Sequence, residues 1–398
     1  MSFQNKTFTE EEEPPQNYNV EKFISPKTQT FIDRYYPWIS FIERNDWKRQ
    51  LQNTINSLEE LEQKLELSKQ EKEIFTSEKI YSFRITPYYL SLLDSKDATH
   101  GLRRTMIPTI HESHHSHGEE DDPLHEDEMS PVEWLIHRYP DRVLFLVTNF
   151  CSARCRYCTR SRIIENNINY SFSRQKRQKA IDYIKSTLTI RDVLISGGDP
   201  LTLDDEQIDR LLGQLKAIPH VEMIRIGTKV PVVLPQRITP SLLAIFKKYH
   251  PLFISIHFTH PEELTIETNK ACIDLADAGI PLGSQTVLLK WINDSLEIIT
   301  WLMHWLLKLR VRPYYLYQCD PISWSVHFRT NITKGLEIMK WLIGYTTGYA
   351  IPHYVIDAPG GWWKIPLLPE YFQWYQDNWD IILQNYEWKK YIYPSNEE

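Results

Sequence analysis

Six short apolar runs rich in β-forming residues recur through the middle of the chain, and this repetition constrains the fold most. After the first interval they begin about thirty residues apart. The runs are 143–148, 192–196, 222–227, 252–257, 284–289 and 312–317. Amphipathic helical patterns follow them, at 174–186, 205–217, 240–249, 261–278, 295–309 and 333–345. Alternating strands and helices predict a parallel sheet with helical crossovers. Because a closed barrel needs eight units, we expect an α/β fold built as an open six-unit, three-quarter βα barrel.

The chain divides into three predicted parts. Residues 1–136 are expected to form a helical N-terminal extension, with a charged helical pattern at 53–79 and a His- and acid-rich loop. Residues 137–365 hold the partial barrel, and residues 366–398 form a short aromatic-rich C-terminal tail. The HESHHSH segment of the loop could suggest a metal site, but such acidic loops are usually solvated. Functional residues are expected where the βα loops gather, at the C-terminal ends of the strands.

Charge and hydropathy exclude several classes of partner. The formal net charge of −7 argues against nucleic acid, which needs clustered basic residues. No run of 18 uncharged apolar residues occurs, so no membrane span is expected. The N-terminal segment has no apolar core behind a basic start, so it is no secretory signal, and we expect a cytoplasmic protein. A small-molecule substrate is the favoured interpretation.

Three of the five cysteines lie in the loop directly after the first predicted strand. The spacing Cys151-x3-Cys155-x2-Cys158 can bring three thiolates to one face of an iron–sulfur cluster, with one iron left open for a small molecule. The alternative is a structural zinc ion, which usually needs four ligands in paired Cys-x2-Cys form. Cys272 and Cys319 are not obviously available as a fourth ligand. The spacing is typical of radical enzymes that use S-adenosylmethionine.

Glycine is scarce, with 13 residues in the chain, so its two Gly-Gly pairs are informative. Gly197 and Gly198, followed by Asp199, end the second strand, where missing side chains allow a ligand to approach the backbone. One βα unit after the cysteines, this segment fits the methionyl part of S-adenosylmethionine. The second pair precedes Lys364 in Asp-Ala-Pro-Gly-Gly-Trp-Trp-Lys. Taken alone Lys364 would be a surface lysine, but a lysine in a rigid turn can also bind pyridoxal phosphate as an imine.

Together the motifs resemble the lysine 2,3-aminomutase family of radical S-adenosylmethionine enzymes. The resemblance runs from about residue 40 to 370 and keeps one order of segments. These are FRITPYY (83–89), HRYPDRV (137–143), the cysteine loop through Arg160, SGGDP (196–200), VVLPQR (232–237), YLYQCD (315–320), HFRT (327–330) and DAPGG (357–361).

The resemblance implies three cofactors. The three cysteines would hold a [4Fe-4S] cluster, and Lys364 would bind pyridoxal 5′-phosphate. S-adenosyl-L-methionine would lie beside the Gly-Gly-Asp segment, His257 and Gln285. The residues that would meet the phosphate of pyridoxal phosphate are Arg138, Tyr139 and Arg142; otherwise they form a solvated basic loop.

The resemblance also implies a substrate site and a reaction. Arg160 would bind the substrate carboxylate as a bidentate donor. Asp320 and Asp357 would hold the distal ammonium of L-lysine; otherwise they are ordinary polar residues at strand ends. A reductant such as flavodoxin or ferredoxin would supply an electron, and S-adenosylmethionine would yield a 5′-deoxyadenosyl radical. The isomerase would then move the α-amino group of lysine to the β carbon.

Three alternatives stay open. Arginine also suits two carboxylates, and its guanidinium could stack on Trp362 or Trp363. A role in modifying a lysyl group of a translation factor is the second alternative, and a non-catalytic cluster-binding protein is the third. Glutamate is disfavoured because both aspartates would repel its side chain.

The sequence departs from the family pattern at three places. Gly-Gly-Trp-Trp stands where the family usually has four glycines, and Tyr157 stands where a histidine is common. No cysteine follows Cys319, so we expect the family's C-terminal zinc site, and part of the subunit contact it supports, to be absent. A homo-oligomer remains compatible with the resemblance.

Overall fold

The computed structural model describes residues 25–77, 82–165, 174–361, 363–376 and 380–394. Its main feature is a nine-stranded sheet whose strands lie side by side in chain order. Seven strands are parallel: β2 (Arg142–Leu146), β3 (Asp192–Ser196), β4 (Met223–Thr228), β5 (Leu252–His257), β6 (Leu282–Leu288), β7 (Val311–Gln318) and β8 (His353–Asp357). The edge strands β1 (Leu135–Tyr139) and β9 (Lys364–Pro366) run antiparallel to their neighbours.

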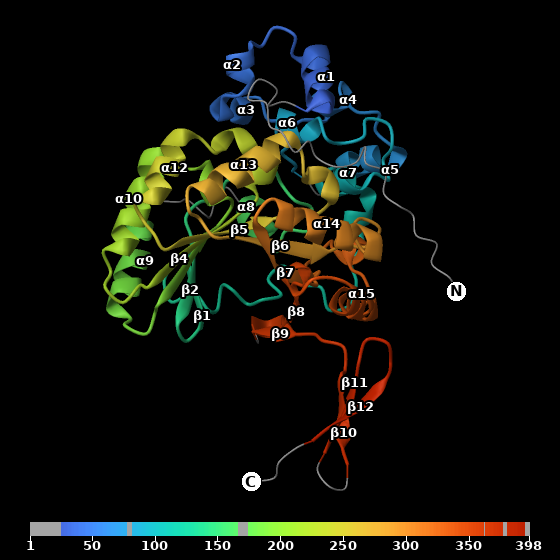
Figure 1. The fold of residues 1–398 in the computed structure, drawn as a ribbon. Coiled ribbons are helices and arrows are strands. Elements are labelled where there is room, and N and C mark those ends of the chain that lie inside the picture. The colour runs from blue at the N-terminus through green and yellow to red at the C-terminus, as the bar shows by residue number, and fades with distance from the viewer. Residues whose placement is uncertain (1–24, 78–81, 166–173, 362, 377–379, 395–398) are drawn as a thin grey trace.

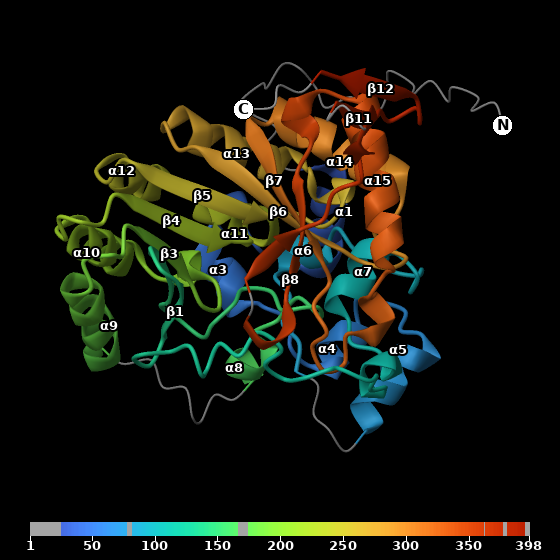
Figure 2. The same cartoon turned by 90° about the horizontal axis from the view of Figure 1, so that it is seen from below.

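Helices connect the parallel strands and cover the outer face of the curved sheet, as Figure 1 and Figure 2 show. The covering helices are α9 (Arg174–Ser186), α10 (Asp205–Lys216), α12 (Pro240–Lys247), α13 (Ile266–Asp277), α14 (Leu296–Lys308) and α15 (Ile332–Tyr345). Two short helices, α8 (Ser161–Glu165) and α11 (Val230–Val233), lie instead in loops that contribute to the inner cavity. The predicted open βα barrel is therefore confirmed. All six predicted strands are present, with bounds that differ by at most two residues.

Three strands of the sheet were not predicted. The strand β8 is a seventh parallel strand, and its short run HYVID lies between Pro352 and Pro359, which hides it as part of a turn. The other two, β1 and β9, close the edges of the sheet. They also bring segments next to β2 and β8 that carry predicted site residues.

Alternation along the strands separates the core from the cavity. In β3, Val193 and Ile195 are buried against the helices, whereas Leu194 and Ser196 line a cavity on the inner side. Because successive side chains of a strand point to opposite faces, the same division repeats along the sheet. The apolar faces of the helices and strands thus form one main core, and two smaller apolar clusters lie beside it.

The N-terminal extension consists of short helices rather than one long one. They are α1 (Pro26–Tyr35), α2 (Phe41–Arg44), α3 (Trp47–Gln52), α4 (Leu58–Glu62), α5 (Lys69–Glu73), α6 (Pro87–Leu90) and α7 (Gly101–Met106). The helical pattern at 53–79 is broken because Ser57 and Ser68 each start a new helix by accepting a hydrogen bond from a backbone N–H three residues later. Figure 1 shows these helices gathered at one end of the barrel.

The C-terminal tail forms a separate three-stranded antiparallel sheet. Its strands are β10 (Phe372–Tyr375), β11 (Ile381–Gln384) and β12 (Lys390–Tyr393), and Figure 1 shows them extending away from the barrel. The division at residues 136 and 365 stays a prediction, although β1 begins at Leu135 and β9 ends at Pro366. Within the described ranges, no helix is long and apolar enough to cross a membrane.

Candidate active site

A cavity of about 400 Å3 lies on the inner side of the sheet, toward the C-terminal ends of the strands. All fifteen residues that the sequence singled out line it, together with others. The sequence thus located this site, while the role of each residue stays a prediction. The fifteen are Cys151, Cys155, Cys158, Lys364, Arg138, Tyr139, Arg142, Gly197, Gly198, Asp199, His257, Gln285, Arg160, Asp320 and Asp357.

The cysteine loop follows β2 and is held by the N-terminal extension. Its backbone N–H groups at Arg154 and Arg156 donate to the carbonyl oxygens of Arg84 and Thr105, at 2.9 and 2.8 Å. Burial raises the pKa of the Cys155 thiol to about 11. It also raises the pKa values of the Cys151 and Cys158 thiols. A bound metal counteracts such a shift because coordination deprotonates a thiol.

The donor chemistry of this loop fits an iron–sulfur cluster. Three thiols of one loop line one cavity, and in the part of the chain that is described no three His, Cys, Asp or Glu side chains are placed to hold a single metal ion. A cluster binds each thiolate to a different iron, so its ligands need not converge on one point. The geometry therefore favours the cluster over the zinc alternative. The described histidines of the HESHHSH loop likewise belong to no group of three such side chains placed to hold a metal ion.

The Gly-Gly-Asp segment is built for close packing between two loops. A Cβ atom on Gly197 or Gly198 would lie 2.3 Å from the carbonyl oxygen of Thr148 or Phe150, and Gly197 has a φ of +133°. The backbone N–H groups of Gly198 and Asp199 donate to these same two oxygens. The glycines are therefore required by the neighbouring cysteine-bearing loop, in addition to any ligand.

The carboxylate of Asp199 is occupied by protein donors. It accepts hydrogen bonds from the Thr228 hydroxyl at 2.6 Å and from the backbone N–H groups of Leu201, Lys229 and Val230. Burial raises the pKa of Asp199 to about 6, against the opposing effect of these hydrogen bonds. Asp199 thus braces the loops after β3 and β4, which was not the reason it was singled out.

His257 and Gln285 lie next to each other, because β5 and β6 pair them in register. Burial and the cations Lys229 and Arg160 lower the pKa of His257 to about 3. The imidazole is therefore neutral at pH 7, and both side chains offer uncharged polar groups to the cavity.

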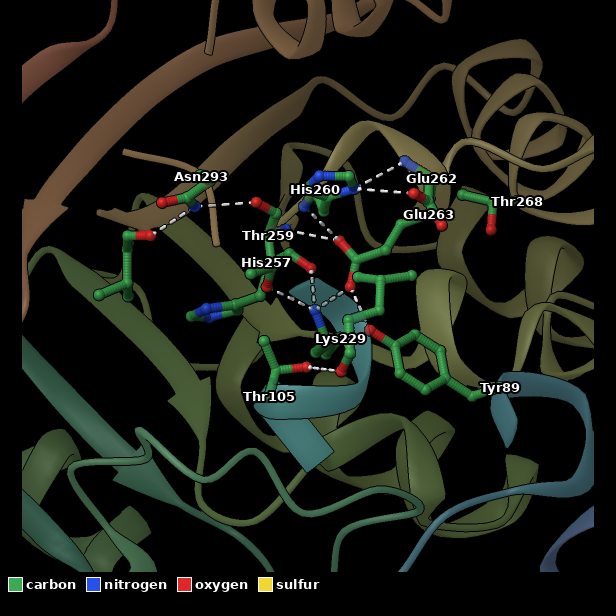
Figure 3. A network of polar contacts seen from close by, with 12 residues as sticks. Tyr89, Thr105, Lys229, His257, Thr259, His260, Glu262, Glu263, Thr268 and Asn293 are labelled. Carbon is green, nitrogen blue, oxygen red and sulfur yellow. Dashed lines mark hydrogen bonds and ion pairs between the residues drawn. The ribbon is translucent and has the colours of Figure 1, made fainter. Parts of the chain in front are cut away.

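A buried polar network that the sequence did not reveal lies behind the cysteine loop (Figure 3). The Lys229 ammonium donates to Glu263 at 2.7 Å, to the Thr259 hydroxyl at 3.1 Å and to the carbonyl oxygen of His257 at 3.2 Å. The Tyr89 hydroxyl donates to the same Glu263 carboxylate at 2.6 Å. Thr259 also shares a 2.7 Å hydrogen bond with Tyr157, which stands between two of the cysteines. The network therefore fixes one side of the cysteine loop.

Strand pairing explains how Lys364 meets Asp357. The two residues are direct partners in the β8–β9 ladder, and the Lys364 ammonium donates to both Asp357 oxygens at 2.9 Å. The β1–β2 ladder likewise places Arg142 opposite Tyr139, with the guanidinium 3.9 Å from the ring centroid. The backbone N–H of Lys364 donates to the Tyr139 hydroxyl at 3.1 Å, so the two edges of the sheet meet here.

This end of the cavity fits pyridoxal phosphate. The side-chain Nη2 of Arg138 is buried and has no hydrogen-bond partner, whereas its Nε donates to the carbonyl oxygen of Gly361 at 2.8 Å. A buried guanidinium with a spare donor suits an anionic phosphate. Lys364 supplies the partly buried amine that the cofactor requires.

Of the two tryptophans that precede Lys364, the structure describes Trp363. The Trp363 ring stacks on Tyr139 at 5.8 Å between centroids, and its indole N–H donates to the carbonyl oxygen of Arg138 at 3.2 Å. It does not line the cavity. Trp362, the other ring predicted to stack on a guanidinium, lies outside the described residues.

Arg160 and Asp320 also line the cavity. The Arg160 guanidinium forms a two-pronged ion pair with Glu126, at 2.9 and 2.7 Å, and the sequence did not reveal this partner. One oxygen of Asp320 is buried without a hydrogen-bond partner. Burial and then the charge of Asp357 raise the pKa of Asp320 to about 7. A cation placed here would satisfy that oxygen.

Comparisons with known proteins match this chain to the family that its motifs resemble. The radical SAM superfamily profile matches residues 145–300, and the C-terminal profile named lysine-2,3-aminomutase matches residues 339–398. L-lysine 2,3-aminomutase of Fusobacterium nucleatum is 48% identical over 355 residues, which are 89% of this chain and 83% of the relative. The enzyme of the same name from Clostridium subterminale is 48% identical over 350 residues, covering 88% and 84%. Glutamate 2,3-aminomutase of Clostridioides difficile is 45% identical over 329 residues, covering 82% and 77%.

Proposed function

This chain belongs to the lysine 2,3-aminomutase family, and we propose that it is an isomerase that moves the α-amino group of L-lysine to the β carbon. The similarity spans most of this chain and most of the relatives. One relative of nearly equal identity is named for glutamate, so family membership alone leaves the substrate's side chain open. The residues of the cavity must decide between these substrates.

The main support for lysine as the substrate is the buried oxygen of Asp320, which has no hydrogen-bond partner. Asp320 and Asp357 line the same cavity as Arg160. A substrate with a carboxylate at one end and an ammonium at the other would find opposite charges at both ends. A glutamate side chain would bring a second anion beside two aspartates, which costs several kcal/mol in a buried site. We therefore favour a cationic substrate.

Three cofactors follow from family membership: a [4Fe-4S] cluster, S-adenosyl-L-methionine and pyridoxal 5′-phosphate. When bound, they supply a 5′-deoxyadenosyl radical and a conjugated ring that stabilises a radical on the substrate. Cys151, Cys155 and Cys158 would hold the cluster, and Lys364 would supply the amine for pyridoxal phosphate. The residues proposed to contact the two organic cofactors are Gly197, Gly198, Asp199, His257, Gln285, Arg138, Tyr139 and Arg142.

The remaining residues bind and orient the substrate. Arg160 would hold the α-carboxylate, and Asp320 would accept hydrogen bonds from the distal ammonium. Asp357 would join Asp320 in this role once Lys364 is engaged by the cofactor and no longer donates to it as a free ammonium. Fixing both ends of a flexible amino acid places its β carbon at one position, which a radical reaction requires.

Further properties are proposed on the same basis. A one-electron reductant such as flavodoxin or ferredoxin would supply the electron, and the protein would work in the cytoplasm. A homo-oligomer is compatible with the exposed aromatic side chains of β10 and β12.

A substrate panel tests the proposal. Anaerobically reconstituted protein would be incubated with a reductant and with lysine, arginine, glutamate or alanine, and the derivatised products would be measured by mass spectrometry. We expect a β-amino product from lysine and little from glutamate or alanine. Efficient turnover of glutamate alone would contradict the lysine assignment and leave the radical chemistry standing. Cys155→Ala serves as the control without a complete cluster.

A further inference from the structure

The loop before β1 contributes a buried carboxylate to the cavity at Glu126. Its side chain is 7% exposed, and it pairs with Arg160 through the Nε and Nη2 atoms of the guanidinium. The loop is held in place from both sides of Glu126, because Arg162 forms ion pairs with Asp122 and Asp127 at 2.9 and 2.8 Å. The position of this carboxylate is therefore fixed by the fold.

Two other buried Arg–Glu pairs show what a purely structural pair looks like. Arg103 bonds Glu71 through Nε and Nη2, and its Nη1 and Nη2 also donate to the carbonyl oxygens of Asp94 and Glu66. Arg103 has no exposed side-chain surface. All three of its nitrogens are thus used within the protein.

Arg156 follows the same rule. Its Nε and Nη2 pair with Glu112, and its Nη1 donates to the carbonyl oxygen of Ser82 at 2.9 Å. The Arg156 side chain is 4% exposed. Arg103 and Arg156 thus each have an acceptor at every guanidinium nitrogen, which avoids the cost of an unpaired buried donor.

Arg160 differs from Arg103 and Arg156. No residue of the described part of the chain accepts a hydrogen bond from its Nη1, and its side chain is 21% exposed, on the wall of the cavity. Glu126 occupies the edge formed by Nε and Nη2, which leaves Nη1 available to a ligand in the cavity that Arg160 lines. A planar guanidinium held along one edge can present the rest in a single orientation.

The charges around Glu126 permit a second anion. Burial is the largest single influence on the pKa of Glu126 and raises it, but the charge and hydrogen bonds of Arg160, together with the charges of Arg162 and Arg138, bring the pKa below its usual value, so the carboxylate is ionised. Three arginines thus surround one carboxylate. A substrate carboxylate at the free end of Arg160 would still enter a cationic environment.

We propose that Glu126 is a positioning residue that orients Arg160 toward the α-carboxylate of the amino acid substrate. The inference rests on the proposed function, because it takes Arg160 as the carboxylate anchor. Glu126 itself does not touch the substrate. It acts by fixing the plane of the guanidinium, so its loss misplaces the anchor without removing the charge of Arg160.

Equilibrium binding separates this role from a structural one. Protein loaded with cluster, S-adenosylmethionine and pyridoxal phosphate, but without reductant, would be titrated by calorimetry with L-lysine and with L-lysinamide, which lacks the carboxylate. In Glu126→Gln we expect lysine to bind roughly tenfold more weakly, with little change for lysinamide. In the Arg160→Lys background, the same substitution should have little effect.

Glu71→Gln is the matched control. It breaks a pair of the same geometry outside the cavity, so it should lower thermal stability without changing the ratio of lysine to lysinamide affinity. If Glu126→Gln does not fold, Glu126→Asp keeps the charge but withdraws the carboxylate, and it should lose the same discrimination to a smaller degree.

Three results would overturn the proposal. If Glu126→Gln bound lysine and lysinamide more weakly by the same factor, Glu126 would be a structural residue. If the variant bound lysine more tightly, Glu126 would be a competitor of the substrate carboxylate. If binding of both ligands were unchanged, Glu126 would have no role in substrate binding. Failure of the proposed function is a different result. In that case the wild-type protein would bind no lysine, and the pair of ligands would be replaced by the amino acid that is turned over and its amide.

Discussion

At the scale of single residues, the two aspartates of the cavity have different environments. Asp357 already binds Lys364 through both oxygens and lies 3.6 Å from the Arg138 guanidinium. Asp320 has one buried oxygen without a partner and a pKa raised to about 7. Asp320 is thus the carboxylate that is free to receive a cation in the structure as it stands.

Lysine binding should therefore depend on the protonation of Asp320. Its neighbours are the anions Asp357 and Glu126 and the cations Lys364 and Arg138. Only the ionised carboxylate pairs with an ammonium, so KM for lysine should fall as pH rises through about 7 and then level off. In Asp320→Asn this part of the pH profile should disappear, and KM should rise roughly a hundredfold. An unchanged profile in the variant would show that another group titrates.

Lys364 should be the residue that holds pyridoxal phosphate. Borohydride reduction followed by peptide mapping should place the cofactor on Lys364 in the wild-type protein. Lys364→Arg keeps a cation beside Asp357 but lacks a nucleophilic amine, so it should show no covalent cofactor and a normal iron content. Lys334→Arg, at an exposed position, is the control and should label normally. A label at another lysine would contradict the assignment.

The sequence was a better guide to which residues line the site than to what each of them contacts. Lys364 and the cysteines were found because their motifs have fixed spacing. Glu126 was missed because His-Glu-Asp-Glu has the composition of a solvated loop, and only the fold brings its second residue against Arg160. Asp199 was found for its motif, but the structure shows its carboxylate bracing two loops.

At the scale of elements, the loops after β2 and β3 are packed against each other through glycine. Gly198→Ala would place a methyl group 2.3 Å from the carbonyl oxygen of Phe150, at backbone that cannot move without moving the cysteine loop. We expect a loss of about 1–3 kcal/mol in the free energy of unfolding and incomplete iron incorporation. Denaturant unfolding and iron analysis measure both. Gly348→Ala, where a Cβ meets nothing within 4 Å, should be neutral; equal effects would contradict this packing argument.

Elements with a clear helical period or a β-rich apolar run were predictable, and three strands of the main sheet without such a pattern were not. The helix α9 has the predicted bounds because its apolar residues recur at helical spacing over 13 residues. The strand β8 lies between Pro352 and Pro359, which hides it as part of a turn, and β9 has three residues, too few to show alternation. The pattern at 53–79 failed for a different reason: capping serines interrupt it, and local hydrogen bonds outweigh average helix propensity.

At the scale of the whole molecule, the βα repeat explains why distant motifs meet. Parallel strands in chain order bring every C-terminal strand end to one side of the sheet, so residues from 138 to 364 share one cavity. This convergence could be predicted from the repeat alone. The edge strands could not, although they place Asp357 beside Lys364 and Tyr139 beside Arg142. The second sheet of the tail also escaped prediction, because its short aromatic strands lie apart from the barrel.

The most direct test of the account follows the nitrogen atom of the substrate. Fully reconstituted protein would be incubated anaerobically with S-adenosylmethionine, reductant and L-lysine labelled with 15N at the α-amino group, and the products would be examined by NMR. The account predicts 3,6-diaminohexanoate with the label on the β carbon, and no such product from Cys155→Ala. Label that stays on the α carbon, or that is released as ammonia, in protein with a full complement of iron and pyridoxal phosphate would contradict it.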